Sequence, residues 1–361
     1  MGSAAACHLS RRGKAILGLD RFRPPHDLGS SHGQTRIIRE AYFEHPSYVP
    51  LIQRGYELWR ELEEEWRSQL MIETGGLMIG APESGIVQGA IRSARLHDLE
   101  HKVFPAEEVA KRFLAIRPPA SMVAVWEPRA GMLFPDRCIS AHLSCAAAHG
   151  ARLHFEEPLV RWEKDGVGVR VKTPEAEYLA DSLVLCPGSW IGSLVPEWEI
   201  PFTVERQVLF WFDPRRNPRN FRTEFCPVHI WEHQPGRYFY GFPAHGDGIK
   251  FAIHHEGQTC DPDTVNRFVM QEEVQTMRDL IRTFVPDANG ELRSTTVCLY
   301  TNLPDGHFLI NAHPDHPRVL VASPCSGHGF KFASVVGEVL ADLATGCNPR
   351  YDLSLFRFRF R

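Results

Sequence analysis

Several features that mark whole classes of protein are missing from this 361-residue sequence. It has no run of basic residues, and its 40 Lys and Arg against 44 Asp and Glu leave a formal net charge of -4, which argues against a nucleic-acid-binding surface. No apolar stretch is long enough to span a bilayer, and the first residues do not form a signal peptide. We therefore expect a globular cytoplasmic protein that binds neither nucleic acid nor membrane.

Paired cysteine motifs are also missing. The nine cysteines are scattered, odd in number and never in a C-x-x-C arrangement. Disulfide frameworks and zinc sites ordinarily show regular cysteine spacings. The sequence therefore predicts a reducing compartment, with neither a disulfide framework nor a metal site.

A third absence concerns the glycine fingerprint G-x-G-x-x-G, which follows the first strand of a dinucleotide-binding βαβ unit. Residues 2–13 are typical of a helix of small residues, and residues 15–19 form a strand-like run that closes on Asp20. This is the second half of such a unit: Asp20 would accept hydrogen bonds from an adenosine ribose, and Gly2 stands at the place of the third glycine. Two interpretations stay open. Either the chain lacks roughly ten N-terminal residues, the size of one strand and its turn, or residues 2–13 form an ordinary surface helix.

What the sequence does contain indicates an α/β (α+β) fold of two parts. Strand-like runs at 152–155, 167–171 and 182–186 follow a small-residue helix, and the last run enters a turn at Gly188. A buried strand that ends in a glycine turn is where a doubly wound sheet binds its ligand. We assign residues 1–71, 135–203 and 307–361 to a discontinuous dinucleotide-binding domain. We assign residues 72–134 and 204–306, which include several aromatic strand-like runs, to a substrate domain.

Two patterns of basic residues could either form part of a binding site or simply face solvent. Arg36 and Arg39 would share a face of a helical turn, where they could bind an oxyanion, but an isolated Arg-x-x-Arg favours a solvated turn. The run 249–254 alternates, so Lys250 and His254 lie on the polar face of a strand. From this segment alone, we expect that face to meet solvent.

The stretch from Cys298 to Gly337 combines a reactive side chain with a glycine-rich helix entry. Two strand-like runs, 307–310 and 319–322, precede the glycine-rich segment 326–329, and residues 335–343 have helical spacing up to Gly346. Free N–H groups at such a helix start favour an anion or developing negative charge. The stretch is therefore a candidate site.

Three motifs together resemble the signatures of the monomeric sarcosine oxidase family, which includes N-methyltryptophan oxidase and pipecolate oxidase. They are residues 29–39 (GSSHGQTRIIR), 298–301 (CLYT) and 326–332 (SGHGFKF). Their order and spacing agree with the family, and the resemblance covers essentially the whole chain. It implies FAD as cofactor, and a discontinuous Rossmann-like FAD-binding domain with an inserted, mixed or antiparallel-sheet substrate domain.

The resemblance also implies a role for each matching residue. Cys298 matches the cysteine that holds FAD through a thioether, Arg39 and Lys331 match the pair that binds the substrate carboxylate, and Lys250 matches the lysine that promotes reaction with oxygen. The remaining matches are His254, Tyr240 and Tyr300 around the substrate, and His32, Arg36, Gly2, Asp20, Gly188, Gly327, His328 and Gly329 around the cofactor. His313 and His316 receive no role, and we expect the histidines without a role on the surface or in loops.

The expected activity is the oxidation of a secondary amino acid by a monomeric enzyme that uses O2. An N-methyl amino acid would give the amino acid, formaldehyde and hydrogen peroxide. A cyclic imino acid such as pipecolate, an inactive truncated homologue without FAD, and a flavin dehydrogenase are the alternatives. Two departures from the family bear on this expectation: the missing phosphate-binding glycines, and Pro324-Cys325 in place of a Gly-Phe pair.

Overall fold

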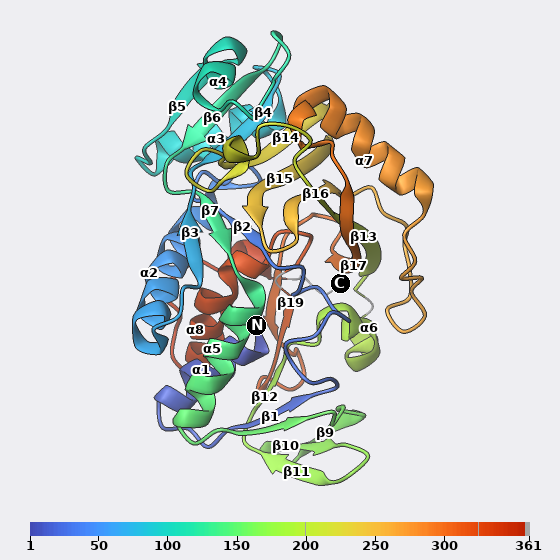
Figure 1. Cartoon of the computed structure of the whole chain (residues 1–361). Helices are drawn as coiled ribbons and strands as arrows, with labels where there is room; N and C mark the ends of the chain where they lie inside the picture. The colour runs from blue at the N-terminus through green and yellow to red at the C-terminus, as the bar shows by residue number, and fades with distance from the viewer. Residues whose placement is uncertain (199, 324, 358–361) are drawn as a thin grey trace.

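The computed structural model describes residues 1–198, 200–323 and 325–357, and it has a large sheet at one end and a layer of helices with smaller sheets at the other (Figure 1). Its α-helices are α1 (Gly2–Arg11), α2 (Val49–Trp66), α3 (Gly85–Leu96), α4 (Ala106–Arg112), α5 (Pro135–Ala148), α6 (Ile191–Leu194), α7 (Gln271–Phe284) and α8 (Ala333–Ala344). Short 3-10 turns are η1 (Pro46–Tyr48), η2 (Gly188–Trp190), η3 (Pro196–Trp198), η4 (Pro218–Phe221), η5 (Pro286–Ala288), η6 (Phe330–Phe332) and η7 (Ser354–Phe356).

The large sheet has eight strands in the order β17-β13-β16-β15-β14-β4-β6-β5. Their bounds are β4 (Gly76–Gly80), β5 (Lys102–Pro105), β6 (Val123–Glu127), β13 (Thr203–Phe212), β14 (Val228–Gln234), β15 (Arg237–His245), β16 (Gly248–His254) and β17 (Leu292–Asn302). Neighbours are antiparallel except for β14 and β4, which are parallel. The sheet is therefore mixed.

The two faces of the large sheet pack against different parts of the chain, because successive side chains along a strand point to opposite faces. Phe210 and Phe212 of β13 belong to the apolar cluster that includes Met277 and Ile281 of α7, so α7 covers this face. Leu209 and Trp211 alternate with these two residues along β13, and they pack with Ala252 and Cys298 on the opposite face. That second face carries the candidate site.

Two parallel sheet fragments lie at the other end of the molecule. β1 (Leu17–Asp20) pairs with β8 (Arg152–Phe155), and β12 (Leu183–Leu185) pairs with β19 (Val319–Ser323), which pairs antiparallel with β18 (Leu309–Ala312). In the described part of the chain, β1 and β12 are not paired with each other. Both strands line one large cavity.

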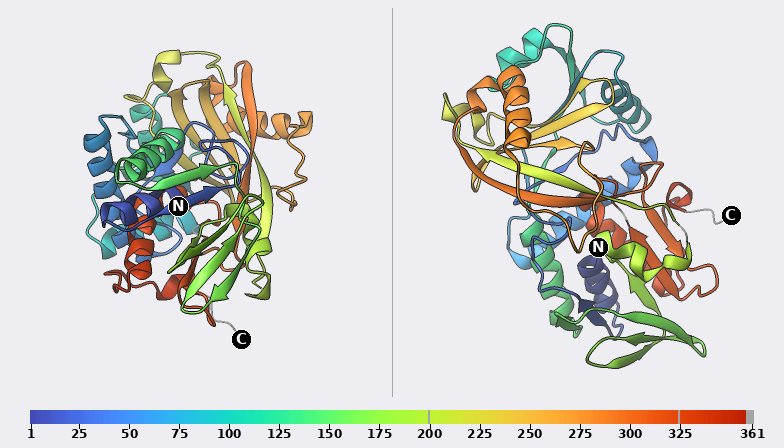
Figure 2. Two further views of the ribbon diagram at one scale, coloured as in Figure 1. Left: turned by 90° about the horizontal axis from the view of Figure 1, so that it is seen from below. Right: turned by 90° about the vertical axis from the view of Figure 1, so that its right-hand side faces the viewer.

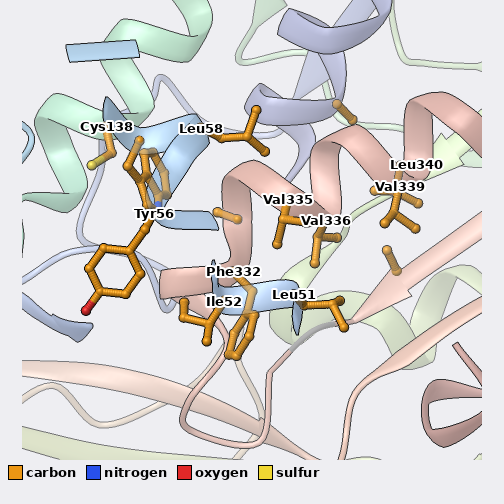
Figure 3. Close-up of a cluster of buried hydrophobic side chains, with 14 of the residues drawn as sticks. Leu51, Ile52, Tyr56, Leu58, Cys138, Phe332, Val335, Val336, Val339 and Leu340 are labelled. Atoms are coloured by element: carbon orange, nitrogen blue, oxygen red, sulfur yellow. The ribbon is translucent and has the colours of Figure 1, made fainter. Parts of the chain in front are cut away.

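Helices α1, α2, α5 and α8 pack together beside these fragments. Figure 3 shows the cluster that joins them: Leu51, Ile52, Tyr56 and Leu58 of α2 lie against Val335, Val336, Val339 and Leu340 of α8. Gly337 allows α1 to approach closely, because a Cβ there would lie 2.6 Å from the backbone of Ala4. This contact fixes α1 at the edge of the cavity.

Two small antiparallel sheets complete the structure. The first, β2 (Arg36–Ile38), β7 (Gly131–Leu133) and β3 (Met71–Glu73), links the helical layer to the large sheet. The second, β9 (Arg161–Asp165), β10 (Gly168–Lys172) and β11 (Glu177–Ala180), lies at the end away from the large sheet (Figures 1 and 2). Among the described residues, no helix combines the length and the apolar character needed to cross a membrane.

Several sequence expectations about local structure are confirmed, and others are wrong. The small-residue helix, the run ending at Asp20 and the helix before Gly346 are present as α1, β1 and α8. Helices α3 and α7 were not expected. Residues 36–39 do not form a helical turn: Arg36 begins strand β2, and in an extended chain residues three apart point to opposite sides.

The cysteine expectation also needs correction. Cys7 of α1 and Cys145 of α5 form a disulfide, with Cα atoms 5.5 Å apart. The two residues are 138 positions apart in sequence, and only the side-by-side packing of α1 and α5 brings them together. Scattered spacing alone could not reveal this pair.

Candidate active site

A cavity of about 2000 Å³ runs between the two parallel sheet fragments and the helical layer. Gly2, Asp20 and Gly188 line it, as do Ser30 and Ser31 of the loop before β2. Burial raises the pKa of Asp20, whose Oδ1 accepts a hydrogen bond of 2.9 Å from the Phe22 N–H. The structure thus brings three of the predicted cofactor-binding residues, Gly2, Asp20 and Gly188, to one cavity, although Gly188 lies far from the other two in sequence.

Cys298 lies next to Ser30, one of the residues that line this cavity. Its side chain is 1% exposed, and its Sγ is 3.6 Å from the carbonyl oxygen of Ser30, a cavity-lining residue. The guanidinium of Arg36 donates to the same carbonyl at 2.8 Å and lies 3.4 Å from Cys298 Sγ.

Lys250 is buried, at 2% exposure, and the expectation that its strand face meets solvent is wrong. Its Nζ donates to the carbonyl oxygens of Gly33 at 2.8 Å and Thr35 at 2.5 Å, and it lies 4.2 Å from the centre of the Phe242 ring. Burial, and then the nearby Arg36 charge, place the pKa of Lys250 well below its ordinary value. The loop 29–35 covers this face of β16, which a reading of the strand alone could not show.

His254, Tyr300 and Tyr240 form one hydrogen-bonded aromatic cluster. The Tyr300 hydroxyl lies 3.2 Å from His254 Nδ1 and 3.5 Å from the Tyr240 hydroxyl. Burial keeps the pKa of His254 well below and the pKa of Tyr300 well above their ordinary values, so both side chains are neutral. Gly327 closes over them at φ +75°, where a Cβ would lie 2.7 Å from ring atoms of both.

Arg39 and Lys331 approach the same aromatic ring. The guanidinium carbon of Arg39 is 4.1 Å from the centre of the Tyr42 ring, and Lys331 Nζ is 5.3 Å from it. Both side chains are buried, so the solvated-turn interpretation of Arg39 is wrong. Lys331 donates to the carbonyl oxygen of His328 at 2.7 Å, and burial, with the Arg39 charge, lowers its pKa to about 7.

Three further residues position the groups around Arg39 and Lys331, and sequence reasoning missed them. Glu44 binds the Arg39 guanidinium through both carboxylate oxygens, and the Tyr42 hydroxyl lies 2.6 Å from His328 Nδ1. Glu127 accepts hydrogen bonds from the backbone N–H groups of residues 40 and 41, and so holds the loop after Arg39. Tyr42 and Glu44 lie close to Arg39 in sequence, and only this proximity could have indicated them. The sequence carries no comparable signal for Glu127.

The histidine expectation is wrong for several positions. His8, His142 and His229 are at most 8% exposed and lie within α1, α5 and β14, whereas His313 lies in the loop after β18, as expected. His313 packs against the rings of Trp162, Trp198 and His316. Pro324 lies outside the described residues, so the Pro324-Cys325 departure is described only at Cys325, whose thiol lies 2.9 Å from the Ser323 hydroxyl.

Comparison with known proteins identifies the family of this chain. The family model described as FAD dependent oxidoreductase matches residues 1–343. The chain belongs to this family of FAD-dependent oxidoreductases. It is 46% identical over 360 residues to the monomeric sarcosine oxidase of Streptomyces avermitilis, an alignment that covers 99% of this chain and 94% of the relative. It is 34% identical to the N-methyl-L-tryptophan oxidase of Salmonella agona, covering 99% and 95%.

A solved structure supports the fold. NikD, described as an unusual amino acid oxidase essential for nikkomycin biosynthesis, superimposes with a TM-score of 0.85 at 22% identity, covering 98% of this chain and 94% of that one. At this identity the likeness concerns the fold alone. The expected combination of a Rossmann-like FAD domain with a mixed-sheet substrate domain is confirmed as a fold class.

The residues present fit an FAD-dependent oxidoreductase. Among the described residues, His32 Nε2 and Thr35 Oγ1 are buried polar atoms without a hydrogen-bond partner, and both belong to the loop between the cavity and Lys250. Burial and the Arg36 charge lower the pKa of His32 to about 3, so its imidazole is neutral and can donate or accept one hydrogen bond at each nitrogen. Buried polar atoms of this kind ordinarily have partners. A bound flavin would supply them.

Proposed function

We propose that this chain is an FAD-dependent oxidase that demethylates an N-methyl amino acid and releases the amino acid, formaldehyde and hydrogen peroxide. The observation that carries the proposal is the convergence of Arg39 and Lys331 on the Tyr42 ring, beside the neutral cluster of His254 and Tyr300. Two buried cations suit one carboxylate. Relatives at 46% and 34% identity are a sarcosine oxidase and an N-methyl-L-tryptophan oxidase, whose substrates share a carboxylate and a secondary amine.

In this proposal the protein holds the substrate and keeps its amine neutral. FAD, when bound, accepts two electrons from the C–H bond next to the amine nitrogen and passes them to O2. His254 and Tyr300 carry no charge, so they neither repel a cationic amine nor stabilise it by ion pairing. The neighbouring cations, Arg39 and Lys331, oppose a protonated amine and favour the form with a free lone pair. No strong general base is needed.

The remaining site residues receive roles on the same basis. Asp20, Gly2 and Gly188 would contact the ADP part of FAD in the cavity, and Gly327, His328 and Gly329 would contact the flavin ring. Lys250, fixed by the carbonyl groups of Gly33 and Thr35, would promote the reaction with O2 in its protonated form, because developing negative charge on oxygen favours the proton that burial disfavours. His32 and Arg36 would contact the flavin, and Tyr240 would line the substrate pocket.

The covalent link through Cys298 is part of the proposal. The buried thiol beside Arg36 and the cavity-lining Ser30 supports it. Acid precipitation of the purified protein tests it: yellow colour should stay with the pellet, and Cys298→Ser should release or abolish it. Cys325→Ser is the matched control, since Cys325 is a free cysteine directly before the last motif, and this variant should leave the colour bound. Free flavin in the supernatant of the unmutated protein would refute the link.

The activity itself is tested by measuring two products. With sarcosine, and likewise with N-methyl-L-tryptophan, the amount of hydrogen peroxide formed should equal the amount of formaldehyde formed. Pipecolate, the alternative substrate class, should give peroxide without formaldehyde, because no carbon leaves a ring. The absence of peroxide with all three substrates, in FAD-saturated protein, would reject an oxidase acting on these substrates. We infer a monomer in solution, which sedimentation can test, and the cytoplasmic location stays a prediction.

A further inference from the structure

A cluster of metal-ligating side chains lies outside the candidate active site, where α1, α2 and α5 meet. Glu65 of α2, Cys145 of α5 and His149, which follows α5, place one ligand atom each within 4.8 Å of one another. Cys7 of α1 is bonded to Cys145, so its sulfur belongs to the same cluster. None of these four side chains has a part in the proposed reaction.

We propose that Cys7, Cys145, His149 and Glu65 form a redox-gated site for a zinc-like divalent cation. Two thiolates, one imidazole and one carboxylate are ligand types that Zn²⁺ binds tetrahedrally. A dithiol reductant transfers two electrons and two protons to the disulfide, becomes a cyclic disulfide itself, and leaves two thiols. The cation then displaces the thiol protons. The oxidised state excludes the metal because its sulfurs are bonded to each other.

The geometry of the cluster is close to what a tetrahedral ion needs. A sulfur and a nitrogen at ordinary zinc distances are about 3.6 Å apart in a tetrahedron, and Cys145 Sγ lies 3.9 Å from His149 Nδ1. This closeness follows from local structure, because residues four apart share one face of a helix. Glu65 approaches from a different helix, so the ligands come from three segments that the fold already holds in place.

Two existing interactions compete with the metal. Glu65 is paired with Arg11, but the Glu65 side chain is 38% exposed, and exposed ion pairs stabilise little. His149 Nδ1 lies 2.9 Å from the Cys145 carbonyl oxygen, so binding through Nδ1 requires the imidazole proton to move to Nε2. His149 is exposed, which leaves a path for the ion, whereas Cys7 and Cys145 are buried.

Cobalt provides a direct readout, because tetrahedral thiolate-bound Co²⁺ absorbs red light where oxidised flavin does not. The purified full-length protein is reduced with a dithiol, freed of reductant and titrated with Co²⁺ without oxygen. We expect one equivalent to produce the bands in the reduced protein and none in the oxidised protein. Excess Zn²⁺ should remove the bands. A reduced protein that gives no bands would overturn the proposal.

Variants locate the site. Cys145→Ser and Cys7→Ser should each abolish or strongly alter the bands, and His149→Gln should weaken Co²⁺ binding at least about tenfold, since even the loss of an outer-sphere partner has an effect of that size. Cys347→Ser and His101→Gln, which change a cysteine and a histidine outside the cluster, are the matched controls. Circular dichroism verifies that each variant is folded. Unchanged bands in Cys145→Ser, or equal weakening in His101→Gln, would contradict the site.

Discussion

The Arg39 guanidinium is held by the Glu44 carboxylate, five residues later in the chain, through hydrogen bonds of 2.6 and 2.7 Å from one nitrogen. The Arg39 side chain is 3% exposed and that of Glu44 is 18% exposed. The cation proposed to bind a substrate carboxylate is therefore already paired with a carboxylate of the protein. A substrate must replace Glu44 or share Arg39 with it.

Replacing Glu44 tests this competition. Glu44→Gln leaves Arg39 buried without its counter-charge, and we expect a loss of about 3 kcal/mol in the free energy of unfolding. Acetate should restore more of the melting temperature in Glu44→Gln than it adds to the unmutated protein, because it can bind the freed guanidinium. Thermal unfolding with and without acetate measures both effects. Glu57→Gln, which removes an exposed partner of Arg54, is the control. An equal acetate effect in all three proteins would argue against competition at Arg39.

The protonation of Lys331 gives a pH dependence. Burial and Arg39 lower its pKa to about 7, so its charge is present below that pH and is lost above it. The groups around it are Arg39, Glu44, Tyr42 and His328. We expect the inhibition constant of a simple carboxylate without an amine to rise, approaching about tenfold per pH unit above pH 7.

Lys331→Met should bind that inhibitor weakly and without this pH dependence. Lys331→Arg keeps a charge across the range and should remove the pH dependence while it retains binding. Inhibition measured from pH 6 to pH 9 distinguishes the two variants. If the slope survived in Lys331→Met, another group would have to be responsible.

Lys250 should affect one half of the reaction only. Lys250→Met removes the cation held by Gly33 and Thr35, and we expect reoxidation by O2 to slow by roughly 100-fold or more. Reduction by substrate without oxygen should change little. Stopped-flow absorbance separates the two steps, and Lys102→Met in β5 is an exposed control. Equal slowing of both steps would mean that Lys250 mainly supports the structure of the site.

Gly327 and Gly306 form a matched pair for testing close packing at the site. Both have positive φ, +75° and +70°, but a Cβ at Gly327 would lie 2.7 Å from His254 and Tyr300, whereas a Cβ at Gly306 would meet no atom of the described residues within 4 Å. Gly306→Ala should lose about 1 kcal/mol through backbone strain alone. Gly327→Ala should lose clearly more and should also lower kcat. Denaturant unfolding of both variants is the measurement, and equal losses would show that the clash is relieved freely.

Glu127 should make stability depend on pH. Burial raises its pKa from 4.5 to about 7, although two backbone N–H groups favour the charged form. The folded state binds the proton more tightly, so the contribution is complete below about pH 4.5 and is lost as pH rises through about 7. The difference is roughly 3 kcal/mol. Urea unfolding at pH 5, 6 and 7 measures this fall in the free energy of unfolding. The fall should occur in the unmutated protein and in Glu107→Gln, an exposed control, but not in Glu127→Gln.

The sequence by itself determined the local elements and the family. Periodic apolar residues and a terminal acid are enough to define α1, β1 and α8, because helix and strand periods are properties of short segments. Three motifs were enough to predict the FAD-dependent oxidoreductase family, which the match over residues 1–343 confirms. Helix α7 was missed although Val274, Met277, Ile281 and Phe284 recur at helical spacing and form its buried face.

Only the tertiary structure decided the surroundings of each charged side chain. A strand pattern cannot tell whether Lys250 faces solvent or a loop from elsewhere in the chain, because burial depends on what packs against the strand. The same holds for Glu44, which neutralises Arg39, and for Lys331, whose lowered pKa comes from burial beside a second cation. The disulfide between Cys7 and Cys145 follows from the packing of α1 on α5. Local sequence encodes local conformation, whereas desolvation and charge pairing arise between segments that only the fold brings together.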